Sequence, residues 1–194
     1  NEIFTGIMIA DNEFLKKGLK GLLRNNKAGE YYLTDLVDYA SKRQLRIGST
    51  MTKEKEILGA NNKEELAVLY KSLISLNVEA AKKKGTIFKD ETTCYVEGNL
   101  KVGKDVRIGS NVTIKGNVKI GNDVCVESNV VLSNVSIGDN SIIKDFCSVE
   151  DSSIAKNVEV GPFARLRDGV VLDDSSKVGN FVEIKKSKIG QGSK

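Results

Sequence analysis

The segment of residues 102–132, VGKDVRIGSNVTIKGNVKIGNDVCVESNVVL, carries an aliphatic residue at every sixth position. A period of six matches neither the repeat of about 3.6 residues of an amphipathic helix nor the alternation of a half-buried strand. It is typical of hexapeptide repeats, in which each hexad forms one short strand and a turn, and three hexads complete a triangular coil. The segment therefore predicts a parallel β-helix whose aliphatic positions point into its interior.

The same frame continues to Ile189, with three steps of five residues in place of six. Its aliphatic positions are Val102, Ile108, Ile114, Ile120, Val126, Leu132, Ile137, Ile143, Val149, Ile154, Val160, Leu166, Leu172, Val178, Ile184 and Ile189. Four residues after most of them lies a second inward candidate, from Val106 to Val182. A corner of the coil can lose one residue without moving the inward positions, so the shorter steps fit the same prediction.

Composition restricts the class of protein. Lysine and arginine total 30 against 26 acidic residues, and a net charge of +4 is too small to indicate nucleic acid or a membrane surface as a partner. Three cysteines without a Cys-x-x-Cys pair indicate reduced thiols, not disulfides or a zinc site. With no long apolar run and no signal peptide, we expect a cytoplasmic protein. The lack of histidine removes the commonest general base at neutral pH.

Residues 1–60 favour the end of an α/β domain. Residues 3–10 are apolar at nearly every position, as in a strand buried on both faces of a sheet, and residues 45–49 could form a second strand. Between them, Asp11 or Asn12 is expected to cap one helix and Thr34 another. Two strands cannot make a stable α/β domain, so we expect most of this domain to precede Asn1.

Residues 61–85 are predicted to form a linker helix before the β-helix of residues 86–194. The sequence Asn62-Lys63-Glu64-Glu65 resembles a capping box, leucines follow at spacings of three and four, and three lysines precede Gly85. Solenoids also need covered ends, so a coil left open at Ile189 should be marginal or prone to aggregation by itself.

Four segments resemble one enzyme family, and the last two are specific. They are residues 29–35 (GEYYLTD), 59–62 (GANN), 161–167 (GPFARLR) and 178–186 (VGNFVEIKK). They resemble the bacterial bifunctional enzymes that join an N-acetylglucosamine-1-phosphate uridyltransferase to a glucosamine-1-phosphate N-acetyltransferase. The resemblance covers essentially the whole chain in the same order. It implies the C-terminal piece of a Rossmann-like nucleotidyltransferase domain followed by a left-handed parallel β-helix.

By this resemblance, the parent enzyme acetylates glucosamine 1-phosphate with acetyl-CoA. It then transfers UMP from UTP to the product, giving UDP-N-acetylglucosamine for cell-wall and lipopolysaccharide synthesis. The family implies Mg²⁺, small-molecule substrates and a homotrimer. Its nucleotide-binding loop is expected before Asn1 and its catalytic histidine just beyond Lys194, so the chain alone should be inactive. Two alternatives are a single-activity acetyltransferase with a degenerate uridyltransferase domain, and a β-helix that serves only to form trimers.

Arg167 and Lys185 each follow an inward aliphatic residue and lie 18 residues apart, on the same side of adjacent coils. Neighbouring strands are about 4.8 Å apart, so both cations should reach one anion. Arginine and lysine together offer a planar fork and a point charge for phosphate, while two solvated surface cations are the alternative. The resemblance assigns both positions to the sugar phosphate and shows Asp168 in place of a common proline. Arg165 stacks on Glu183 by the same spacing, for which we expect an ion pair, with substrate contact as the alternative.

Three further predictions rest on the resemblance. Asn61 looks like the asparagine that helps to hold Mg²⁺ at the uridyltransferase site, although Asn61 or Asn62 could simply cap the linker helix. The segment from Glu30 to Thr34 resembles one near the bound N-acetylglucosamine. Phe4 replaces an asparagine that hydrogen-bonds the sugar, which phenylalanine cannot do, so sugar binding or uridyl transfer is expected to be altered.

Overall fold

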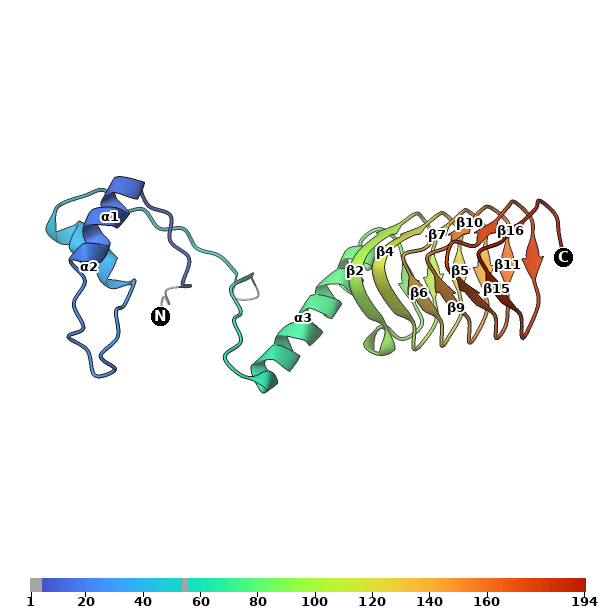
Figure 1. The fold of residues 1–194 in the computed structure, drawn as a ribbon, viewed down its shortest axis with the longest axis horizontal. Helices are drawn as coiled ribbons and strands as arrows, with labels where there is room; N and C mark the ends of the chain where they lie inside the picture. The colour runs from blue at the N-terminus through green and yellow to red at the C-terminus, as the bar shows by residue number, and fades with distance from the viewer. Residues whose placement is uncertain (1–4, 54–55) are drawn as a thin grey trace. The chain divides into compact units, whose positions relative to one another are not determined.

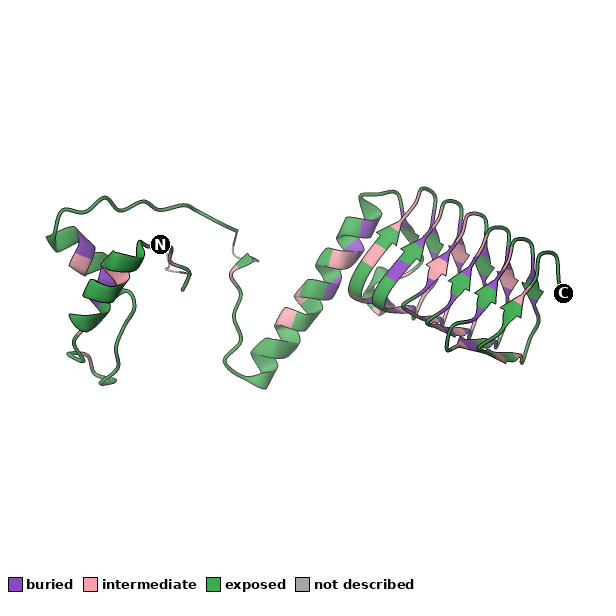
Figure 2. Ribbon diagram, turned by 45° about the horizontal axis from the view of Figure 1, so that its top comes forward, coloured by how far each residue is buried: buried purple, intermediate pink, exposed green. Residues whose placement is uncertain are grey.

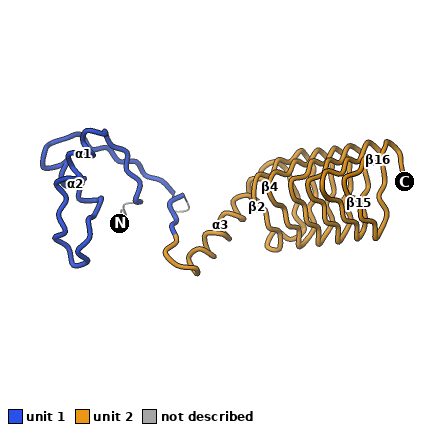
Figure 3. The backbone as a smooth tube through the Cα atoms, in the orientation of Figure 1, with its two compact units in different colours: residues 1–59 blue, residues 60–194 orange. Residues whose placement is uncertain are grey.

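The computed structural model describes residues 5–53 and 56–194. The chain divides into two compact units, Asn1–Gly59 and Ala60–Lys194, which Figure 3 colours separately. The first unit contains short helices, and the second contains one long helix followed by a stack of short strands (Figure 1). The helix predicted over residues 61–85 therefore forms one compact unit with the solenoid.

The first unit is built on two short helices, α1 (Asn12–Lys20) and α2 (Asp35–Lys42). Asp11 caps α1, because its carboxylate accepts hydrogen bonds from two backbone N–H groups of the first turn. Leu36 of α2 is fully buried, and it lies so close to Gly18 of α1 that a Cβ atom there would come within 2.6 Å of the Leu36 side chain. The close approach of the helices therefore depends on glycine at this position.

The two strands expected in the first unit are not formed in its described residues. Residues 5–10 and 45–49 have no regular secondary structure, and Ile9 is 98% exposed. An apolar strand of a parallel sheet is stable only between partner strands, and the first strand of the described chain begins at Ile87. The apolar pattern alone was therefore not sufficient to form a sheet here.

The linker helix, α3 (Lys63–Lys82), begins at the predicted capping box. The side-chain oxygen of Asn62 accepts from the backbone N–H of Glu65 at 2.8 Å, and the Asn62 amide donates to the Glu65 carboxylate at 3.0 Å. Farther along, Ile74 and Val78 are buried in the same apolar cluster as the first coil of the solenoid. The helix thus covers the apolar end of the stack at the first coil and serves as the end cap that a solenoid requires.

The solenoid consists of three faces, and every strand pair in it is parallel. The first face holds β1 (Ile87–Phe88), β3 (Arg107–Ile108), β5 (Cys125–Val126), β8 (Ile142–Ile143), β11 (Glu159–Val160) and β14 (Lys177–Val178). The second holds the first parts of β2 (Tyr95–Val102) and β4 (Thr113–Ile120), then β6 (Val131–Ser133), β9 (Ser148–Glu150), β12 (Arg165–Arg167) and β15 (Glu183–Lys185). The third holds the last parts of β2 and β4, then β7 (Ser136–Ile137), β10 (Ser153–Ile154), β13 (Val171–Leu172) and β16 (Lys188–Ile189). A 3₁₀ turn, η2 (Glu91–Thr93), lies between the first two strands.

The six-residue frame coincides with the interior of the solenoid. Every aliphatic position from Ile108 to Val178 is at most 4% exposed, and Val102, Ile184 and Ile189 are partly buried against the same cluster. Figure 2 shows buried segments repeated along the stack of coils. The predicted parallel β-helix is therefore confirmed, including the three shorter steps.

The corner between the second and third faces is formed by residues in left-handed conformation. These residues, which we call the corner column, are Gly98, Gly116, Asn134, Asp151, Asp168 and Lys186, with φ between 44° and 129°. Glycine, asparagine and aspartate adopt this conformation at the lowest cost. Backbone hydrogen bonds connect this corner from coil to coil, as from the N–H of Gly169, the residue after Asp168, to the Asp151 carbonyl at 2.9 Å. The side chains of the column therefore emerge from one edge of the molecule.

Outward charges also pair between coils. Glu159 on β11 contacts Lys144 on one neighbouring coil and Lys177 on the other, the latter at 2.9 Å. Hydrogen bonds from these two lysines lower the pKa of the Glu159 carboxyl from its ordinary value of 4.5. The alternating charges of the turns are thus organised into ion pairs along the stack.

Candidate phosphate-binding site

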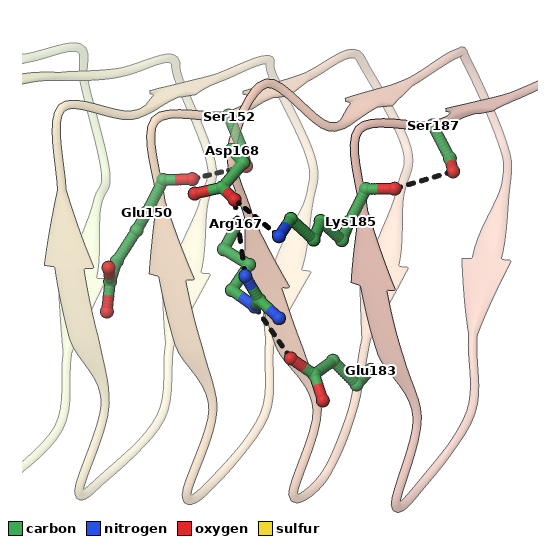
Figure 4. A network of polar contacts seen from close by, with 7 residues as sticks. All are labelled: Glu150, Ser152, Arg167, Asp168, Glu183, Lys185 and Ser187. Carbon is green, nitrogen blue, oxygen red and sulfur yellow. Dashed lines mark hydrogen bonds and ion pairs between the residues drawn. The ribbon is translucent and has the colours of Figure 1, made fainter.

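Strands β12 and β15 bring the two predicted phosphate ligands together. The register aligns Arg165 with Glu183, Leu166 with Ile184 and Arg167 with Lys185. Leu166 is fully buried, so its two arginine neighbours must lie on the outer face of the strand. The predicted stacking of the two cations on adjacent coils is confirmed, and Figure 4 shows both side chains on this face.

Two carboxylates compensate the charge of these cations. Arg167 donates from Nε to Glu183 Oε1 at 2.6 Å and from Nη1 to Asp168 Oδ2 at 3.2 Å. Lys185 Nζ lies 3.4 Å from the same Asp168 oxygen. Arg167, Lys185, Asp168 and Glu183 therefore form a cluster of two positive and two negative side chains on two adjacent coils (Figure 4).

The ion pair expected between Arg165 and Glu183 is replaced by one between Arg167 and Glu183. The Cα partners are as predicted, but a carboxylate can reach either arginine that flanks Leu166. Arg167 is the better partner because Asp168 already holds the other edge of its guanidinium group, leaving Nε directed at Glu183. The predicted register is therefore confirmed, whereas the predicted partner of Glu183 is wrong, and Asp168 is a member of the cluster that the sequence pattern did not indicate.

The ion pair with Glu183 stabilises the charged form of both groups. Its hydrogen bond raises the pKa of Arg167 and lowers the pKa of the Glu183 carboxyl below its ordinary value. Both side chains are partly open to water, at 28% and 52% exposure, so the pairing orients them more than it stabilises the fold. Arginine has five N–H donors and lysine three, so donors remain for an anion.

The remaining predicted residues lie elsewhere. Glu30 and Thr34 belong to the first unit, where the Glu30 N–H donates to Asn26 and Thr34 occupies the N-cap position of α2 without a side-chain capping bond. Phe4 lies outside the described residues. Glu30 and Thr34 thus belong to a different compact unit from β12 and β15.

Asn61 is held by the first turn of α3. Its backbone N–H and side-chain amide donate to Glu65 Oε2 at 2.7 and 3.2 Å, and the capping role falls to Asn62. This orientation directs the amide nitrogen of Asn61 at the Glu65 carboxylate and would leave its oxygen available to a cation. The described residues contain no group of three histidine, cysteine or acidic side chains placed to hold a metal ion. Within that part of the chain, Asn61 is therefore a single candidate ligand and does not make a complete Mg²⁺ site.

A shallow hollow of about 580 Å³ lies beside the cluster, along the corner column and the third face. It is lined by Asn117, Lys119, Asn134, Val135, Ser136, Asp151, Ser152, Ser153, Gly169, Val170 and Val171. Neither Arg167 nor Lys185 lines it, and the Lys185 and Asp168 side chains are 47% and 40% exposed, so the cluster is open to solvent. Among the helices of the described residues, none has the length and apolar character needed to cross a membrane.

Comparisons with known proteins give three likenesses. Residues 91–149 match the family described as the GMPPB C-terminal domain. The bifunctional protein GlmU of Marinomonas sp. (strain MWYL1) is 39% identical over 194 residues, which is 100% of this chain and 43% of that protein. The crystal structure of Francisella novicida UDP-N-acetylglucosamine acyltransferase matches over 56% of each chain, with 18% identity and a TM-score of 0.34. The chain thus spans less than half the length of the curated relative.

Proposed function

We propose that this chain, which is related along its whole length to the bifunctional protein GlmU, contributes the sugar-phosphate site of a glucosamine-1-phosphate N-acetyltransferase. The observation that carries this proposal is the register of β12 and β15, which puts Arg167 and Lys185 side by side on the outer face. A phosphate between them would accept charge-assisted hydrogen bonds from both. The resemblance seen in the sequence motifs supports the choice of substrate.

In the proposed reaction, the substrate amine attacks the thioester carbonyl of acetyl-CoA. The new C–N bond forms as the C–S bond breaks, CoA leaves as the thiol, and the amine loses one proton. Arg167 and Lys185 hold the phosphate. Glu183 orients the guanidinium group of Arg167 by accepting a hydrogen bond from its Nε. Binding at the phosphate would hold the substrate on the coil surface, which would lower the entropy cost of bringing its amine to the acetyl donor. We assign no general base to this chain, which has no histidine.

We propose a second activity, uridyl transfer from UTP, for the protein to which the first unit belongs. Glu30 and Thr34 would lie near N-acetylglucosamine, Phe4 would alter its recognition, and the amide oxygen of Asn61 would be one ligand of Mg²⁺. The bound metal would supply charge neutralisation at the phosphates of UTP. A cytoplasmic location and a homotrimer belong to the same proposal. All of these assignments are supported by the 39% sequence identity between this chain and the bifunctional protein GlmU.

The complete protein provides the test. Arg167→Ala and Lys185→Ala should each raise KM for glucosamine 1-phosphate about tenfold to a hundredfold, the range expected for one lost hydrogen bond to a charged group. Arg165→Ala, on the same strand but outside the cluster, is the matched control and should stay within about threefold. Size-exclusion chromatography must show an unchanged oligomer. Unchanged acetyl transfer in the first two variants would refute the phosphate site and favour a β-helix that acts only in assembly.

A further inference from the structure

We propose that Asp168 is an internal competitor for the sugar phosphate, because its carboxylate occupies the place between Arg167 and Lys185 that a phosphate oxygen would take. The inference rests on the proposed function of those two cations. One oxygen of Asp168 lies 3.2 Å from Arg167 Nη1 and 3.4 Å from Lys185 Nζ. Figure 4 shows the Asp168 carboxylate between the two cations, and an anion shared by both would have the same bridging arrangement.

The position of Asp168 in the corner column explains why its side chain reaches this place. Asp151 is the preceding member of the column, one coil away and also left-handed. The Asp151 carboxylate accepts from the side-chain amide of Asn134 at 3.0 Å and so continues the line of polar side chains along the column. Asp168 cannot extend that line without placing one carboxylate beside another, which is unfavourable. Its side chain instead turns toward the two cations on the second face.

This placement has two opposing effects on ligand binding. Without ligand, Asp168 screens the repulsion between Arg167 and Lys185 and keeps them close, so the site is formed in advance. A phosphate, however, must displace the carboxylate before it can bridge both cations, and the exchange weakens binding. The Asp168 side chain is 40% exposed, so after displacement it can be hydrated without leaving an unpaired charge buried. Asp168 thus sets the affinity of the site by exchange of one anion for another.

The test compares Asp168→Asn with Asp151→Asn in the complete protein. Asparagine keeps the left-handed backbone and the size of the side chain but removes the charge, and Asp168→Gly provides a second variant that tolerates the same φ. Isothermal titration would measure Kd for glucosamine 1-phosphate and for inorganic phosphate. We expect Asp168→Asn to bind both about threefold to tenfold more tightly, as for the loss of two exposed ion pairs, and the control to change less than twofold.

The outcomes separate this inference from the proposed function. Equal or weaker binding of both phosphates by Asp168→Asn and Asp168→Gly would overturn the competitor role. If Arg167→Ala weakens binding while Asp168→Asn leaves it unchanged, the phosphate site stands and only the competitor role is lost. If Arg167→Ala leaves the Kd unchanged, the proposed phosphate site fails, and the competitor role fails with it.

Discussion

Strand β8 offers a direct test of the six-residue frame, because it contains two consecutive isoleucines with opposite orientations. Ile143 is fully buried between Val126 and Val160 of the neighbouring coils, whereas Ile142 points outward and is 38% exposed. Ile143→Ala removes three buried carbons and leaves a cavity, which should reduce the free energy of unfolding by about 2–5 kcal/mol. Ile142→Ala loses the same intrinsic strand propensity but leaves no cavity, so about 1 kcal/mol or less is expected. The difference between the two variants isolates the contribution of the inward position.

Urea unfolding followed by far-ultraviolet circular dichroism would measure both values. The m-value should be the same in the two variants, because a change in m would indicate that a repeat unfolds separately instead of with the whole stack. Equal destabilisation by the two substitutions, or a larger effect at Ile142, would refute the assignment of inward positions. The same result would remove the basis for placing Arg167 on the outer face.

Three further predictions concern the cap, the charges and the thiols. Asn62→Ala should reduce the free energy of unfolding of α3 by about 1 kcal/mol. Thermal melting followed by the helical circular dichroism signal would measure the loss, and an unchanged melting curve would contradict the capping box. Because the folded-state pKa of Glu159 is depressed, its ion pairs stabilise the protein above about pH 4.5 and lose that effect as the pH falls through the lowered value. Glu159→Gln should therefore flatten the acid side of the urea-midpoint profile, and a profile parallel to that of the wild type would argue against it. Burial raises the pKa of the Cys94 and Cys147 thiols, so Cys125 should react first with a thiol reagent, and equal rates for all three would refute the buried assignment.

The solenoid was predictable because one chemical requirement recurs at a fixed interval. Each coil must place an aliphatic residue on every face, and a single period therefore determines the strands, the interior and the register. The alignment of Arg167 with Lys185 follows from that register, since 18 residues make one complete coil at this position. Long-range contacts in a solenoid are repeated local ones, which is why sequence was sufficient here.

The partners of the outward charges were not predictable in the same way. A long side chain at a given register position can reach several neighbours, and the choice depends on the other charges nearby. Asp168 decides it here, because its turn geometry directs a carboxylate to Arg167 and leaves Nε for Glu183. The only sequence signal was aspartate directly after arginine at a turn. The strands expected over residues 3–10 and 45–49 are absent from residues 5–10 and 45–49 for a related reason, since a strand pattern cannot supply its own partner strands.

The most direct measurement of the central claim compares two acetyl acceptors that differ only in the phosphate. The complete protein and its Arg167→Ala, Lys185→Ala and double variants would be assayed for acetyl transfer to glucosamine 1-phosphate and to glucosamine. If both cations hold the phosphate, each substitution should lower kcat/KM for the phosphorylated acceptor about tenfold to a hundredfold, with losses in the double variant that do not add. The low activity with glucosamine should stay the same in all four proteins. Equal losses with both acceptors, or no loss with either, would contradict a phosphate site on β12 and β15.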